Sequence, residues 1–193
     1  MLPLWLWSSV VAATVPVSPA TPDIRVTRAT QLFDQLCLKA FPSDAALDDA
    51  AKSMGAIALT PDQVKVTLVN DPGRGWALGE NGTTYLIFLE LPPFHACSVR
   101  WSMPEGEIDL GEYRALIENE KTARAGFTTI HEFDRDAGDI HIHAVGEQRI
   151  LPEGGSEALL LFDQRVIDPA RRARGETATN WRFVRQFAGP GAP

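Results

Sequence analysis

The chain contains two cysteines, Cys37 and Cys97, and their surroundings constrain its fold more than any other feature. Cys37 lies on the apolar side of a predicted helix, and Cys97 shares one face of a predicted strand with Val99 and Trp101. If that helix packs on that strand, the two sulfur atoms meet in one interior. We therefore predict a disulfide between Cys37 and Cys97. The alternative is a pair of buried free thiols.

The first twenty residues, Met1 to Ala20, form an uncharged and largely apolar segment that ends in a small-x-small pattern. Such a segment is typical of a signal peptide that is cut after Ala20. We therefore expect a periplasmic or secreted protein, because thiols form stable disulfides in those compartments. The apolar run is shorter than the ~20 residues that span a bilayer, and we expect no transmembrane segment in the mature chain. The alternative is a buried N-terminal segment.

The mature region, residues 21–193, has about 170 residues, which is the usual size of one domain. We therefore expect a single domain with its own hydrophobic core. The chain has a net charge of −7 at pH 7. This acidic balance argues against nucleic acid as a partner, because nucleic-acid binding needs an excess of lysine and arginine.

Helical periodicity and capping signals predict helices in the N-terminal third of the mature chain and one long helix in its middle. The predicted helices run from Thr27 to Phe41, from Ser43 to Met54, from Thr60 onwards, and from Asp109 to Ala125, with a single turn after Asp168. Strand patterns are expected at Trp76–Gly79, Thr83–Leu91, Phe94–Trp101, Phe127–Arg135, Asp139–Glu147, Ala158–Ile167 and Thr177–Phe187.

This order of elements predicts an α+β fold. We expect an antiparallel sheet of about six to seven strands, with the N-terminal helices and one long central helix packed on one face. Asn81-Gly82 between two apolar runs is a strong hairpin signal, since both residues tolerate a positive φ. A doubly wound parallel fold is disfavoured, because parallel neighbours need long crossover connections.

Three of the four histidines, His131, His141 and His143, lie in one predicted hairpin. A three-residue loop with Gly138 in the left-handed position sets His131 opposite His143 and places all three imidazoles on one face. Such a set is suited to zinc or copper, with a water or carboxylate completing the site. In the alternative register, His141 and His143 face carboxylates. The alternative to a metal site is a solvated strand face on which the histidines are ordinary polar residues.

The C-terminal end carries six arginines between Arg165 and Phe187, against two carboxylates. Guanidinium groups bind phosphate or carboxylate bidentately, so this end is a candidate surface for an anionic envelope component or an envelope protein. A solvated arginine-rich face is the alternative interpretation. The residues predicted to bind the anion or partner are Arg171, Arg172, Arg174 and Arg182.

No motif in the chain defines a reaction. A nucleophile elbow, a phosphate-binding glycine loop, a dinucleotide fingerprint and a His-Glu-x-x-His helix are all missing from the sequence. We therefore assign no catalytic residue and no required cofactor. A hydrolase whose site assembles only in the folded chain is the third interpretation.

The segment from Leu32 to Leu38 with Phe41-Pro42, together with His95 to Val99, resembles a group of small exported proteins of unknown function from Gram-negative (alphaproteobacterial) bacteria. The resemblance covers about the first half of the mature chain. It implies export and the pairing of the cysteines, and it brings no active site with it. The sequence therefore favours an exported, disulfide-bonded, non-catalytic binding domain, with a histidine metal-binding protein as the alternative.

Overall fold

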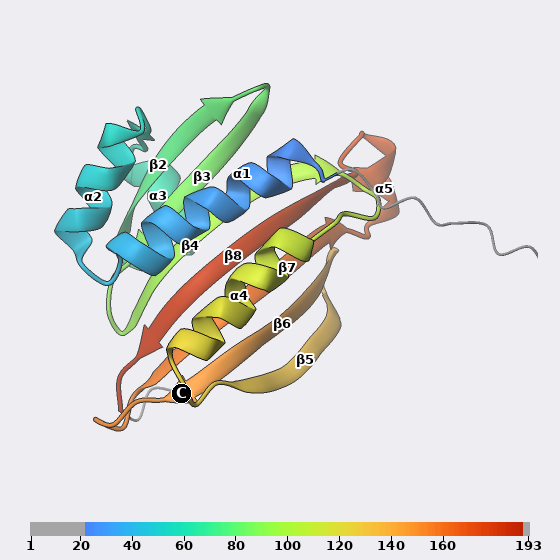
Figure 1. The fold of residues 1–193 in the computed structure, drawn as a ribbon. Helices are drawn as coiled ribbons and strands as arrows, with labels where there is room; N and C mark the ends of the chain where they lie inside the picture. The colour runs from blue at the N-terminus through green and yellow to red at the C-terminus, as the bar shows by residue number, and fades with distance from the viewer. Residues whose placement is uncertain (1–21, 191–193) are drawn as a thin grey trace, which may run out of the picture.

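The computed structural model describes residues 22–190, so the predicted signal peptide, Met1 to Ala20, lies outside the described residues. Eight strands form one antiparallel sheet in the order β1-β2-β3-β4-β8-β7-β6-β5 (Figure 1). The strands are β1 (Ile57–Ala58), β2 (Gly73–Glu80), β3 (Thr83–Glu90), β4 (Phe94–Pro104), β5 (Thr128–Ala137), β6 (Ile140–Ile150), β7 (Ser156–Val166) and β8 (Ala178–Ala188). The helices are α1 (Ile24–Leu32), the π-helix η1 (Phe33–Ala40), α2 (Asp44–Ser53), α3 (Pro61–Thr67), α4 (Gly111–Ala123) and α5 (Pro169–Ala173). The predicted α+β class and antiparallel sheet are confirmed.

Two finer expectations about these elements were wrong. The sheet has eight strands because β1 also pairs with β2, and a two-residue strand is too short to show an alternating pattern. The expected single long helix is also incorrect. α4 has 13 residues, whereas α1 continues directly into η1 and makes a longer helical run from Ile24 to Ala40. This run begins after Asp23, whose side chain accepts a hydrogen bond from the backbone of Arg25, and not at Thr27.

The main core lies between one face of the sheet and the helices α1, η1, α2 and α4 (Figure 1). Alternation along β3 turns Ile87 and Leu89 toward this core and Phe88 toward the other face. There Phe88 packs against Val64 and Leu68, so α3 covers the end of that second face. The expectation that the N-terminal helices pack on one face together with the central helix was therefore wrong for α3. We call the second face, which bears Phe88, the open face.

Two local signals in the sequence, a hairpin turn and a helix cap, are confirmed by the structure. Asn81 and Gly82 both have positive φ values, 49° and 75°, in the tight turn between β2 and β3. Thr60 and Gln63 form a reciprocal capping box at the start of α3. Among the described residues, no helix is long and apolar enough to cross a membrane.

Cys37 and Cys97 form the predicted disulfide, which joins η1 to β4. Both residues are fully buried, and their Cα atoms lie 5.3 Å apart. The bond therefore fixes the N-terminal helical run to the centre of the sheet.

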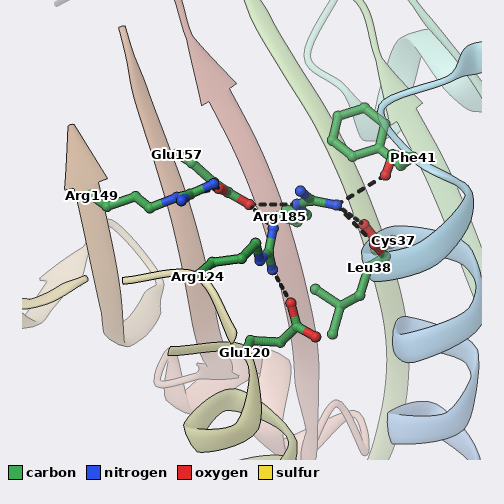
Figure 2. Close-up of polar contacts among 8 residues, drawn as sticks. All are labelled: Cys37, Leu38, Phe41, Glu120, Arg124, Arg149, Glu157 and Arg185. Carbon is green, nitrogen blue, oxygen red and sulfur yellow. Dashed lines mark hydrogen bonds and ion pairs between the residues drawn. The ribbon is translucent and has the colours of Figure 1, made fainter. Parts of the chain in front are cut away.

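A buried arginine on the strand next to Cys97 contacts the same helix (Figure 2). The Nη1 group of Arg185, on β8, donates to the carbonyl oxygens of Cys37, Leu38 and Phe41 at 3.1, 3.0 and 2.9 Å. These carbonyls lie at the end of η1, where helices leave acceptors without partners. The interpretation of Arg185 as part of a solvated arginine face was therefore wrong, since this side chain caps a helix inside the core.

Glu157 provides the negative charge that this buried arginine needs. It is 0% exposed and contacts Arg185, Arg124 and Arg149 at 2.7, 2.5 and 2.6 Å (Figure 2). Burial alone raises the pKa of a carboxyl group, but the charges of Arg185 and Arg124 outweigh it and lower the pKa of Glu157. Arg124 also pairs with Glu120 on α4, so the network connects α4 to the sheet.

Candidate ligand-binding site

Three of the four arginines predicted to bind anions lie on or next to α5, and each forms ion pairs within the chain. The pairs are Arg171 with Asp139 and Glu176, Arg172 with Glu105, and Arg174 with Glu176. The hydrogen bond from Arg171 also lowers the pKa of Glu176. The positive charge of this group is therefore largely neutralised by neighbouring carboxylates.

Arg182 lies apart from that group, on the open face of the sheet. It stands on β8 directly opposite Arg100 on β4. Among the described residues, neither arginine has a carboxylate within ion-pair distance, which distinguishes them from the arginines at α5. Two like charges therefore occupy neighbouring positions on one sheet face without an acidic partner in contact.

Aromatic rings and neutral polar groups position the two guanidinium groups. Arg100 lies 4.6 Å from the centre of the Phe88 ring, and its Nε donates to the Ser98 hydroxyl at 3.0 Å. Arg182 lies 5.5 Å from the centre of the Phe162 ring. Stacking on a ring restricts a guanidinium group and leaves its edge N–H donors available.

Burial and mutual repulsion make the positive charges of Arg100 and Arg182 unfavourable. Burial lowers the pKa of both arginines, and the pKa of Arg100 falls to about 9 because the positive charge of Arg182 adds to the effect of burial. Both groups stay charged at neutral pH. Glu90, on the same face of β3, is close enough to interact with both arginines electrostatically. Burial and the neighbouring charge of Asp71 raise the pKa of Glu90. An anion bound between the arginines relieves this unfavourable charge.

A hollow of about 550 Å³ opens beside the pair. Its lining combines Arg100 and Arg182 with uncharged hydroxyl and amide groups, and with Arg25, which is paired with Asp23. Two of its lining residues are joined by a hydrogen bond, in which the Ser102 hydroxyl donates to the side-chain oxygen of Asn180 at 2.6 Å. The other polar lining residues include Thr83, Thr84 and Gln164. This set provides donors for an oxyanion and hydrogen-bonding groups for a polar body attached to it.

Sequence reasoning named Arg182 but missed Arg100. Arg100 stands between Val99 and Trp101, in a strand identified by its apolar residues, and a single arginine there reads as an ordinary outward-facing residue. The signal emerges only when β4 is paired with β8, because that pairing sets Arg100 opposite Arg182. These strands are far apart in sequence, and no local pattern specifies their register.

The register of the histidine hairpin differs from the predicted one and from its alternative. β5 and β6 are joined by a two-residue turn, Gly138-Asp139, with Ala137 paired to Ile140. Gly138 has the positive φ of 64° that this turn needs at its first position, so Ala137 avoids the strained conformation. The predicted pairing of His131 with His143 was therefore wrong. A bulge between Ile130 and Phe133 shifts the register further along.

His141 and His143 both contact carboxylates. His143 Nδ1 contacts Asp163 at 2.7 Å and its Nε2 contacts Glu132 at 2.8 Å. His141 contacts Asp136 at 2.8 Å and Asp134 at 3.0 Å. The side chain of His131 lies outside the described part of the structure.

These contacts bear on the predicted zinc or copper site. Among the side chains that the structure describes, which do not include that of His131, no group of three or more His, Cys, Asp or Glu residues is arranged to hold a metal ion. The imidazole nitrogens of His143 are both engaged, so each carboxylate must be displaced before that nitrogen binds a metal. Metal binding by His131, His141 and His143 stays a prediction.

Comparison of the chain with protein-family models, with curated proteins and with solved structures found no match. The resemblance to small exported proteins therefore stays a prediction.

Proposed function

We propose that this chain is an exported, disulfide-bonded, non-catalytic binding domain that holds an anionic group of an envelope component between Arg100 and Arg182. The observation that carries this proposal is the juxtaposition of two arginines on the open face without a carboxylate in contact. Phosphate and carboxylate oxygens match the spacing of guanidinium N–H donors, so these are the groups that we expect to bind.

The neighbouring residues define the class of ligand further. Thr84, Ser102, Asn180 and Gln164 offer uncharged hydrogen-bonding groups in the same hollow. A polar molecule with one anionic group, such as a sugar acid or a sugar phosphate, satisfies both the charges and these groups. Nucleic acid is disfavoured, since the chain as a whole is acidic.

One observation supports a location outside the cytosol, and a second supports binding in preference to catalysis. A buried disulfide is compatible with an oxidising compartment, as the apolar segment from Met1 to Ala20 also suggests. His143, which lines a largely apolar hollow between α4 and the sheet, has both ring nitrogens engaged by carboxylates, so neither is free to act as a base.

The proposed site is tested by calorimetric titration of the purified protein with inorganic phosphate and with glucuronate. Arg100→Gln/Arg182→Gln is expected to weaken binding at least about tenfold, because both charge-assisted contacts are lost. Arg171→Gln/Arg172→Gln is the matched control, since it removes the same charge from arginines that already have partners. Equal losses in the two double variants would mean that binding depends only on net charge and would reject the site. No binding of either anion would also reject it.

Export is tested separately from binding. The full chain is produced in a Gram-negative host, and the periplasmic fraction is analysed by intact-mass measurement. We expect a mature protein that begins at Thr21. A protein that keeps Met1 and stays in the cytosolic fraction would contradict the proposal.

A further inference from the structure

The acidic side chains of strands β4 to β8 are confined to one face of the sheet. The strand registers, together with the contact between Glu132 and His143, place all of them on the face that α1 and α4 cover (Figure 1). These carboxylates are Glu132, Asp134, Asp136, Glu147, Glu157 and Asp163. At the strand positions that the structure describes, the open face of β4 to β8 therefore carries no carboxylate, although the chain has a net charge of −7.

The open face of these strands carries positive charge. Arg135 on β5 shares this face with Arg100 and Arg182. Its guanidinium group lies 4.3 Å from the centre of the Phe133 ring, so each of the three arginines stacks on a phenylalanine. Among the described residues, no carboxylate lies within ion-pair distance of Arg135, because its acidic neighbours in β5 point to the other face and contact His141. The face therefore presents three cations, each stacked on an apolar ring.

The rest of this face is largely apolar. Among the described helices that contribute buried residues to a core, α3 alone packs on it, at the end formed by β2 and β3. At the usual spacing of about 4.8 Å between strands and about 3.4 Å per residue, β4 to β8 form a face of about 24 Å by 35 Å. Its exposed and part-exposed apolar residues include Phe133, Ile140, Ile142, Ile150, Leu160 and Phe162. A wide apolar face with polar groups at intervals is typical of a docking surface.

The charges on this face specify the partner. Glu90, on β3, borders the face and offsets part of the charge of Arg100 and Arg182, but three arginines against one carboxylate leave the face cationic. A second copy of the chain packed face to face is disfavoured, because the arginines of both copies would meet without a carboxylate between them. An anionic phospholipid surface provides phosphate groups for the arginines and an apolar layer directly below those groups.

The negative charge of the whole chain opposes such docking only weakly. The carboxylates of β4 to β8 lie on the far side of the sheet. Salt at an ionic strength of about 0.1 M screens charges beyond about 10 Å, so the charges that face the membrane decide the interaction.

We infer that the open face of β4 to β8 docks on an anionic phospholipid surface. This docking rests on the anion site proposed above, because the phosphate of one headgroup lies between Arg100 and Arg182. A phosphoglycerol headgroup also has hydroxyl groups for Ser102 and Asn180 in the same hollow. Arg135 contacts a second headgroup, and the apolar side chains around it lie at the boundary between the headgroups and the acyl chains.

Binding of the purified protein to vesicles tests the docking, and calorimetric titration with inorganic phosphate tests the arginine pair alone. Flotation compares vesicles of phosphatidylcholine with vesicles of phosphatidylcholine and phosphatidylglycerol in equal amounts. We expect the protein to bind the mixed vesicles at least about tenfold more tightly than the neutral vesicles. Arg100→Gln/Arg182→Gln is expected to weaken binding to both phosphate and the mixed vesicles at least about tenfold.

Two variants separate docking from phosphate binding. Ile150→Glu places a carboxylate on the open face at the end of β6, where Ile150 is 74% exposed. It is expected to weaken binding to the mixed vesicles at least about fivefold. Arg135→Gln removes one cation from the face and is expected to weaken this binding about fivefold. Both variants should leave the affinity for inorganic phosphate unchanged, because neither position belongs to the hollow beside the arginine pair.

Two substitutions in α4 are the matched controls. Ala115→Glu and Arg114→Gln make the same changes of charge at exposed positions of the helix that covers the other face of the sheet. Each is expected to change the affinity for the mixed vesicles less than about twofold, because salt screens charges at that distance.

The outcomes distinguish the docking from the anion site. A protein that binds inorganic phosphate but neither kind of vesicle would overturn the docking and leave the anion site intact. Equal losses of vesicle binding in Ile150→Glu and Ala115→Glu would mean that only net charge matters, and would also overturn the docking. A dimer in light scattering that Ile150→Glu dissociates would assign the face to a second copy of the chain. Failure to bind inorganic phosphate would reject the arginine pair and, with it, the docking.

Discussion

Arg185 on β8 and Glu157 on β7 form a buried ion pair, with 2.7 Å between Arg185 Nε and Glu157 Oε1. The same guanidinium group donates to three carbonyl oxygens at the end of η1 (Figure 2). One side chain therefore completes both the charge balance of the core and the end of the helix that carries Cys37.

We predict that Glu157→Gln strongly destabilises the protein. It removes the negative charge that compensates Arg124, Arg149 and Arg185, and breaking a buried charge network in this way typically costs about 3–5 kcal/mol. The free energy of unfolding, measured in urea, should fall by this amount, while Glu153→Gln changes it little. A loss below about 1 kcal/mol would show that the network contributes little.

The disulfide between Cys37 and Cys97 is expected to supply a large share of the stability. It joins residues separated by 60 positions, and closing a loop of this length stabilises the folded state by about 4 kcal/mol in the chain-entropy model. Cys37→Ala/Cys97→Ala should lose about this much free energy of unfolding. Two thiols that alkylate freely in the unreduced native protein would contradict this account.

His143 makes stability depend on pH. Burial lowers the pKa of this imidazole, but its hydrogen bonds to Asp163 and Glu132 outweigh burial and raise the pKa above its usual value. Its contribution is therefore fully present below the unfolded-state pKa of about 6.5 and is lost as the pH rises through the higher folded-state pKa.

A double-mutant cycle of His143→Gln and Asp163→Asn measures this dependence. The coupling free energy between the two residues should be largest near pH 6 and should decrease toward about pH 9. A coupling that is constant, or that grows with pH, would contradict a protonated His143 in the folded protein.

Much of the fold was readable from local residue types. Asn81-Gly82, the Thr60 capping box and the inward-facing Cys37 each specify geometry over a few residues, and each prediction matched the structure. The strand β1 was not predicted, because two residues are too few to show an alternating pattern. The predicted hairpin register was wrong because the register is set by a Gly138-Asp139 turn and by a bulge between Ile130 and Phe133, which the residue types alone do not specify.

The candidate site was only half predictable. Arg182 stood out as part of an arginine-rich end, but the structure divides that end into neutralised arginines at α5, a buried helix cap at Arg185 and, on the open face, Arg182 in a half-buried pair with Arg100. These three roles differ in burial and in the carboxylates within reach. Both properties depend on pairing between distant strands, which composition does not reveal.

The most direct test of the central claim is an NMR titration of the arginine side-chain Nε–Hε groups with inorganic phosphate. The account predicts saturating shifts at Arg100 and Arg182, with those of Arg171 and Arg172 unchanged. Shifts that never saturate, or that appear first at Arg171 and Arg172, would contradict an anion site on the open face of the sheet.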